Sequence, residues 1–233
     1  MKTSVKLLLG LLLAFIMAMF GAAVSVKKQY DQLDKSDKYA RWQKRPLAPF
    51  RVVQLTGPSA ALVQIEPGNS PRILSDSLSQ WRKTSYTQRV ERDTLFLQIE
   101  PAEGWNFRPE DTDDEWHGPQ LVVQVPALDA VSTQNAICQI TGFRGRTLTL
   151  QQRGAGGRTA VENLTLDQLT AILSGKNQLT LYGINNRIST GTFAIRDSAR
   201  LFQYTDFTQG MTLDASPMAT LRLTGKAMQQ AKQ

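Results

Sequence analysis

The chain contains one histidine, His117, and one cysteine, Cys138, and each is a candidate for nucleophilic catalysis. A serine hydrolase would need His117 as its general base, but the sequence has no Gly-x-Ser-x-Gly motif. Cys138 lies in the alternating stretch Ile137-Cys138-Gln139-Ile140, where a lone cysteine usually acts as a small hydrophobic residue. We therefore expect no catalytic residue, no cofactor and no enzymatic activity.

Two other patterns that could support chemistry have simpler interpretations. Ca²⁺ prefers oxygen ligands, and four neighbouring carboxylates could supply them: Asp111, Asp113, Asp114 and Glu115. Their spacing lacks the glycine and distal glutamate of an EF-hand loop, so we expect a solvated loop without a metal. The glycine-rich stretch 153–158 lacks the Lys-Ser/Thr pair of a phosphate loop and predicts a turn.

β-Helical polysaccharide lyases need clustered acids beside a basic residue on one face. The basic residues in this part of the chain are instead scattered and have no paired acids: Arg144, Arg146, Arg153 and Arg158. One cysteine also excludes an internal disulfide, and one cysteine with one histidine excludes a zinc module.

Aromatic residues mark a long acidic loop at 101–120 as a candidate ligand-binding segment. Exposed aromatic rings can stack on sugars, and the same rings could instead cap the side of the folded domain. Loops of this length are often functional. The candidate contacts are Trp105, Phe107, Trp116 and His117.

The positive charge of the chain is concentrated at its N-terminus. The formal net charge is +7, and residues 1–45 carry nine basic and three acidic side chains. Residues 46–233 carry 18 basic and 17 acidic side chains, so this part is nearly neutral. A nucleic-acid-binding domain is expected to carry a basic face, and we therefore expect no nucleic-acid partner.

Residues 7–26 form an uncharged apolar run long enough to cross a membrane. A helix of 20 residues spans about 30 Å, which matches the bilayer hydrocarbon core. The residues that predict the anchor are Leu7, Leu13, Phe15, Phe20 and Val26. The alternative is a signal peptide cleaved after Ala23 or Ser25. We expect a single-pass protein of the bacterial inner membrane with its C-terminal domain in the periplasm, or a secreted protein if the signal is cleaved.

The remaining chain divides by composition into a stalk, a β-rich domain and a tail. A charged juxtamembrane stalk is predicted at 27–48, a β domain at 49–226 and a frayed polar tail at 227–233. Short alternating stretches predict two strand pairs, one at 50–55 and 61–65 and another at 86–91 and 94–99. A short helical turn is expected at 77–83.

An imperfect repeat of about 21 residues runs through the C-terminal half. Apolar pairs begin at Leu148, Leu169 and Met211, and Phe193 falls three residues late for the position between the last two. Ser132, Ser174 and Ser216 are separated by two steps of 42 residues. Stacked repeats of this kind can share one core. The pattern predicts an all-β parallel solenoid of about five irregular coils, with an antiparallel sandwich as the alternative.

The order of these segments resembles a known family. Two β segments (50–65 and 86–99), a Val-x-x-Pro-x-Leu pattern at 123–128 and repeated strands with Ser/Thr-Gly turns are similar to the auto-transporter adhesin family called the head GIN domain. The resemblance covers residues 48–225. It implies a single-stranded right-handed parallel β-helix in the cell envelope, and it implies no enzymatic activity.

Together these features predict a membrane-anchored, non-enzymatic binding module of the cell envelope. The expected partners are membrane lipid, through the N-terminal helix, and an envelope glycan, peptidoglycan or protein. A bactofilin-like structural polymer and an anchored lipid carrier are the alternatives.

Overall fold

A computed structural model of the 233-residue chain describes residues 3–32, 37–58, 61–76, 85–100, 118–183, 185–225 and 227–230. The chain divides into two compact units, Met1–Arg41 and Trp42–Gln233. The expected helical turn at 77–83 lies outside the described residues.

The first unit contains a long apolar helix, α1 (Thr3–Gln32). Its stretch Leu8–Lys28 is long and apolar enough to cross a membrane, a test that a signal sequence also passes. Leu7 lies within this helix, and the side chains of Leu13, Phe15, Phe20 and Val26 are exposed along it. The helix continues six residues beyond Val26, so the charged segment after the apolar run begins as helix.

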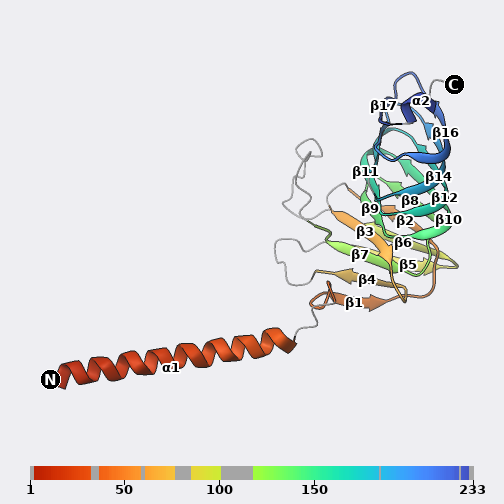
Figure 1. The fold of residues 1–233 in the computed structure, drawn as a ribbon. Helices are drawn as coiled ribbons and strands as arrows, with labels where there is room; N and C mark the ends of the chain where they lie inside the picture. The colour runs from red at the N-terminus through yellow and green to blue at the C-terminus, as the bar shows by residue number, and fades with distance from the viewer. Residues whose placement is uncertain are drawn as a thin grey trace. The chain divides into compact units, whose positions relative to one another are not determined.

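The second unit is built from two sheets that face each other across one core (Figure 1). Sheet B has the order β16-β14-β12-β10-β8-β2-β6-β5, and sheet A has the order β1-β4-β7-β3-β9-β11-β13-β15-β17. The strands of sheet B are β2 (Val52–Thr56), β5 (Tyr86–Glu91), β6 (Thr94–Ile99), β8 (Ala130–Gln134), β10 (Arg144–Arg153), β12 (Thr165–Leu173), β14 (Arg187–Ile195) and β16 (Phe207–Ala215). The strands of sheet A are β1 (Gln43–Pro46), β3 (Leu62–Pro67), β4 (Arg72–Ser75), β7 (Leu121–Val125), β9 (Ile137–Thr141), β11 (Ala155–Glu162), β13 (Lys176–Leu181), β15 (Arg200–Gln203) and β17 (Thr220–Leu223). A short helix, α2 (Ala227–Gln230), follows β17.

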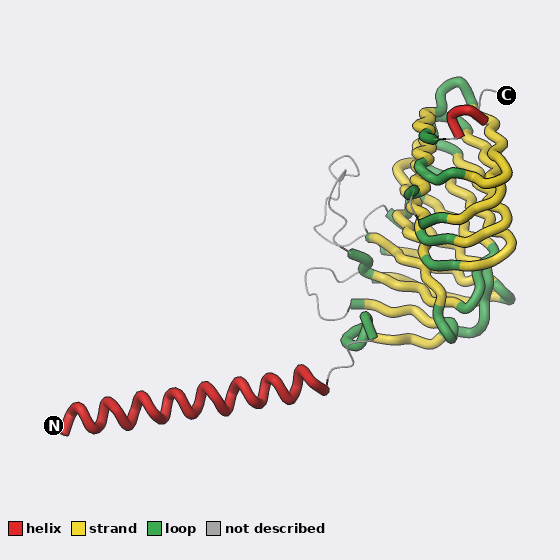
Figure 2. The backbone as a smooth tube through the Cα atoms, viewed as in Figure 1, coloured by secondary structure: helices red, strands yellow, loops and turns green. Residues whose placement is uncertain are grey.

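From β8 to β17 the chain winds as a parallel solenoid. Consecutive strands alternate between the two sheets, and each strand pairs in parallel with the strand one turn away. Figure 2 shows this winding as a stack of loops and strands. Five such strand pairs, from β8/β9 to β16/β17, make about four complete turns. The predicted solenoid is therefore confirmed, and the antiparallel sandwich is wrong.

The register of sheet B corrects the predicted repeat at one position. Leu148 is opposite Leu169, Leu169 is opposite Gly191, and Gly191 is opposite Met211, so the steps are 21, 22 and 20 residues. Gly191, and not Phe193, therefore occupies the position between Leu169 and Met211. The sequence obscured this because the position has no side chain: a Cβ on Gly191 would lie 2.6 Å from Cε2 of Phe193.

The serine spacing was also misleading at one position. Ser174 and Ser216 follow equivalent strand ends, because Leu173 and Ala215 both align with Ile195. Ser132 lies opposite Gln151, inside the strand ladder, and belongs to a different column.

The N-terminal end of the solenoid is not stacked in chain order. β2 lies between β8 and β6, and β3 lies between β9 and β7, so the first strands are sandwiched between later ones. β2 and β3 are in different sheets, so the predicted pairing of 50–55 with 61–65 is wrong: each strand pairs with later strands of its own sheet. The predicted pairing of β5 with β6 is confirmed as an antiparallel ladder.

Two further antiparallel strands close sheet A at this end. β4 pairs with β7, and β1 pairs with β4. β1 spans Gln43–Pro46 and so lies inside the predicted stalk at 27–48. Four residues of that segment therefore belong to the sheet, where their backbone forms a regular ladder.

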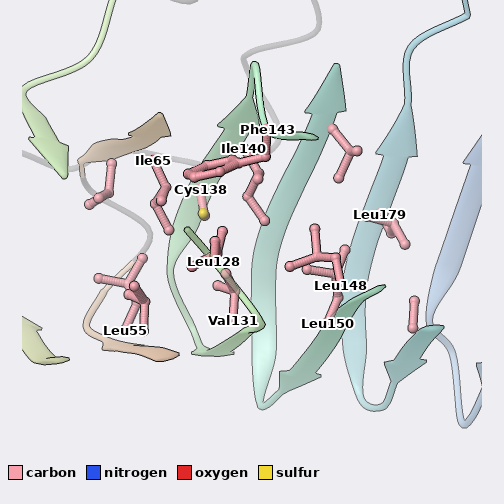
Figure 3. Packing of buried hydrophobic residues seen from close by; sticks show 14 of the residues in the cluster. Leu55, Ile65, Leu128, Val131, Cys138, Ile140, Phe143, Leu148, Leu150 and Leu179 are labelled. Carbon is pink, nitrogen blue, oxygen red and sulfur yellow. The ribbon is translucent and has the colours of Figure 1, made fainter. Parts of the chain in front are cut away.

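The core follows from the strand alternation, which sends every second side chain inward. Leu55, Val131 and Leu150 of sheet B face Ile65 and Ile140 of sheet A, as Figure 3 shows. These side chains fill the space between the sheets and are less than 3% exposed. Burial of this apolar surface is the main stabilisation of the domain.

Candidate functional site

The outer face of sheet A carries cations and aromatic rings on adjacent strands. Parallel register places Arg158 of β11 opposite Gln178 of β13, and Gln178 opposite Arg200 of β15. Neighbouring strands lie about 4.8 Å apart, so the two arginine backbones are about 10 Å apart. We name this surface the basic–aromatic face and define it by Arg158, Lys176, Gln178, Tyr182, Arg200, Phe202, Tyr204 and Arg222.

A groove of about 300 Å³ lies at the cationic end of this face. Its lining comprises Ala155, Gly156, Gly157, Arg158, Lys176, Gln178 and Arg200. The groove exists because β11 begins with three small residues at a register shift. Gly157 is required there, since a Cβ would lie 2.6 Å from Oδ1 of Asn177, which accepts the Gly157 N–H at 2.8 Å.

The glycine-rich stretch is therefore a solenoid corner, as the sequence predicted. β10 ends at Arg153, Gly154 has a φ of 92°, and β11 begins at Ala155. The left-handed backbone at Gly154 turns the chain from sheet B into sheet A. The small residues Ala155, Gly156 and Gly157, which follow this corner, line the groove.

The groove is electropositive. The lining residues that the structure describes include three cations and no carboxylate. Two of these cations are arginines, whose planar guanidinium groups can bind carboxylate or phosphate oxygens in a bidentate manner. Glu162, at the other end of β11, accepts a hydrogen bond from Nε2 of Gln139 at 2.7 Å. The groove is thus suited to an anionic ligand.

The aromatic part of the face begins beside Arg200. Phe202 is two residues further along β15 and lies between Thr180 and Arg222 in the register. The Arg222 guanidinium lies over the Tyr204 ring, 5.6 Å from its centroid. Tyr182 is 43% exposed and follows β13 directly. These rings offer flat apolar surfaces next to a cationic groove.

Burial raises the pKa of Tyr182, and the charge of Glu162 raises it further. The Tyr182 phenol therefore stays protonated at neutral pH and can donate a hydrogen bond to a ligand.

We next compare the candidate residues predicted from the sequence with the structure. Trp105, Phe107, Trp116 and His117, together with the acidic residues at 111–115, lie outside the described residues. Cys138 is fully buried, and burial raises the pKa of its thiol to about 12, so its thiolate is not available at neutral pH. Within the part of the chain that the structure describes, no cluster of metal-ligating side chains occurs.

The four scattered arginines separate in the structure. Arg144, Arg146 and Arg153 lie on β10 of sheet B, and Arg158 belongs to the basic–aromatic face. Sequence reasoning missed the partner of Arg158 because Arg200 is 42 residues away. The signal was present as the repeat itself, since steps of 20 and 22 residues lead from Arg158 to Gln178 and then to Arg200.

Comparisons with known proteins give weak similarities. No protein-family model and no curated protein matches the chain. Among solved structures, a "putative adhesin" from Parabacteroides distasonis is 11% identical, with a TM-score of 0.42 and coverage of 77% of each chain. A "putative adhesin" from Bacteroides fragilis is 12% identical, with a TM-score of 0.42 and coverage of 78% of this chain and 95% of that one. A "putative lipid binding protein" from Parabacteroides distasonis is 12% identical, with a TM-score of 0.33 and coverage of 78% and 96%. These values assign no family, so the head GIN resemblance stays a prediction.

Proposed function

We propose that the chain is a non-enzymatic, membrane-anchored binding module of the bacterial cell envelope, whose basic–aromatic face holds an acidic glycan. The observation that carries the proposal is the groove of Arg158, Lys176 and Arg200, beside which lie the exposed ring of Tyr182 and the half-buried ring of Phe202. Acidic sugars carry carboxylates that the cations would bind, and their apolar ring faces would pack on Phe202 and Tyr182.

The architecture favours an extended ligand over a small one. The face crosses β11, β13, β15 and β17, which are joined by continuous parallel ladders. A polymer lying across these strands would meet cations at Arg158 and Arg200 and again at Arg222. A preformed surface of this kind loses little conformational entropy on binding.

The proposed location follows from α1. As an uncleaved span, Leu8–Lys28 would hold the protein in the inner membrane, with the solenoid in the periplasm. Peptidoglycan and anionic envelope polysaccharides would then be within reach. Cleavage of the segment as a signal would give a secreted module with the same binding face.

The test measures the binding of polygalacturonate and of dextran, a neutral polymer, to the full chain in detergent micelles by isothermal titration calorimetry. We expect binding of polygalacturonate that weakens with added salt, and no binding of dextran. The double variant Lys176→Gln/Arg200→Gln should bind polygalacturonate at least tenfold more weakly. The matched control is Arg144→Gln/Arg187→Gln, which removes the same charge from exposed positions of sheet B.

The proposal fails if polygalacturonate does not bind, or if both double variants lose affinity equally. Equal loss would show a response to net charge and not to the groove.

A second candidate function is self-association through the C-terminal end of the solenoid. β17 pairs only with β15 among the described strands, and Leu221 is 37% exposed on it. An open edge strand can pair with another chain. Sedimentation velocity of the full chain in micelles tests this candidate, because a sedimentation coefficient that does not change with concentration would exclude it.

A further inference from the structure

A second groove, of about 480 Å³, lies on the outer side of sheet B where β2, β6 and β5 meet. Its lining comprises Gln54, Thr56, Thr87, Gln88, Arg89, Phe96, Leu97 and Gln98. The sequence analysis named none of these residues as a candidate site, and the acidic-glycan proposal does not use them.

The register arranges six of the outward side chains as two short rows. Phe96 of β6 lies opposite Gln54 of β2 on one side and opposite Arg89 of β5 on the other. Two residues along β6, Gln98 lies in the same way between Thr56 and Thr87. The result is a half-buried aromatic ring bordered by amide and hydroxyl groups.

The charge in this groove is already compensated. The Arg89 guanidinium lies over the Phe96 ring, 4.7 Å from its centroid. Its Nη1 also forms an ion pair with Glu91 at 3.2 Å. An anion therefore gains little from the Arg89 charge in this groove.

We propose that this groove is a separate binding site for an uncharged sugar. Gln54 and Gln98 each offer both an acceptor oxygen and donor hydrogens, and Thr56 and Thr87 offer hydroxyls. This is the mixture that sugar hydroxyl and acetamido groups can satisfy, because they too donate and accept. The half-buried Phe96 ring, which lines the groove, supplies apolar surface against which the C–H groups of a pyranose can pack.

The surroundings of Phe96 favour an uncharged sugar over an apolar ligand and over a polyanion. An apolar ligand would cover the amides and hydroxyls of four neighbouring residues without giving them partners, which is costly. A polyanion could bind only one cation in this groove, Arg89, which already forms an ion pair with Glu91. The site is consequently distinct in chemistry from the basic–aromatic face, and the two lie on different sheets of one domain.

The test titrates the full chain in detergent micelles with chitotetraose and cellotetraose, two uncharged oligosaccharides, using calorimetry and ¹H–¹⁵N spectra. We expect at least one of them to bind, with chemical-shift changes confined to β2, β5 and β6. Phe96→Ala should weaken the binding at least tenfold, and Phe96→Trp should retain it because the flat ring is kept. Gln168→Ala, an exposed glutamine of β12 outside the groove, serves as the matched control and should bind as the parent does.

Failure of both oligosaccharides to bind would overturn the proposal, as would shift changes centred on β11, β13 and β15. It would equally be overturned if Phe96→Ala and Gln168→Ala had the same effect. The variant Lys176→Gln/Arg200→Gln should leave this binding unchanged, so the outcome is independent of the acidic-glycan proposal.

Discussion

Replacing Asn186 with alanine should remove hydrogen bonds that join successive turns of the solenoid. This side chain lies in the corner between β13 and β14 and is 8% exposed. Its Oδ1 accepts the backbone N–H of Leu164 in the preceding turn, at 2.8 Å. Its Nδ2 donates to the carbonyl oxygens of Val161 (3.1 Å) and Tyr182 (2.7 Å). It also donates to Oγ1 of Thr205 in the following turn, at 3.1 Å.

The loss of stability depends on which of the groups bonded to Asn186 keep another hydrogen-bond partner after the substitution. The Val161 carbonyl still accepts the N–H of Tyr182 at 3.0 Å, and the Tyr182 carbonyl still accepts the Thr205 hydroxyl at 3.0 Å. The N–H of Leu164, a fully buried residue, loses the partner that Asn186 provides. A buried donor left unpaired costs about 1–3 kcal/mol, and each weakened carbonyl bond adds about 0.5–1 kcal/mol. We therefore expect Asn186→Ala to lower the free energy of unfolding by about 2–5 kcal/mol.

The assay is urea unfolding of the full chain in detergent micelles, followed by circular dichroism of the β domain. The matched control is Asn185→Ala, because Asn185 is the exposed neighbour and its loss should change the free energy of unfolding by less than about 0.5 kcal/mol. Asn186→Asp should also destabilise, since it keeps the acceptor for Leu164 but replaces both donors with a buried carboxylate. Equal stability of Asn186→Ala and Asn185→Ala would refute the reasoning.

Two further predictions concern the core. Gly191→Ala should lower the free energy of unfolding by about 1–3 kcal/mol, because its Cβ would lie 2.6 Å from the Phe193 ring and 2.7 Å from the Phe207 ring. Urea unfolding checks this against Gly145→Ala, where the nearest atom lies 3.9 Å away, and equal effects would contradict it. Burial raises the pKa of Cys138 from 9.0 to about 12. Deprotonation therefore favours the unfolded chain above pH 9, and by pH 12 the stability lost to this group should be about 4 kcal/mol. Unfolding measured from pH 8 to 12 should show a shallower decline for Cys138→Ala, and parallel declines would contradict the assignment.

The sequence indicated the C-terminal solenoid because its repeat is local. The step from Leu148 to Leu169 equals one turn, and each turn carries the same inward alternation. The N-terminal end could not be predicted in this way. Placing β2 and β3 between later strands depends on pairings with partners up to about 80 residues away, and no short-range pattern specifies such pairings.

The hydrogen bonds at the corners of the solenoid could not be predicted from the sequence either. No pattern in the sequence distinguishes Asn177 or Asn186, yet both are buried and bond to backbone groups of the preceding turn. Asn186 joins three turns through Leu164, Tyr182 and Thr205, and Asn177 joins its own turn to the preceding one through Gly157; only the stacked structure shows these bonds. Asparagine suits this role because its short side chain carries both an acceptor and two donors.

Strand alternation and the length of each solenoid turn determine both the fold and the basic–aromatic face. Alternation decides that Arg158, Gln178 and Arg200 point outward, and the turn length decides that they lie side by side. Asn177 then fixes the floor of the groove through the Gly157 N–H, so the corner that stabilises the solenoid also positions the cations. A rigid corner beneath a charged groove lowers the entropy lost on binding, because the cations are held on a surface formed before the ligand arrives. Weakening the Asn177 corner should therefore reduce both the stability of the domain and its affinity for polygalacturonate.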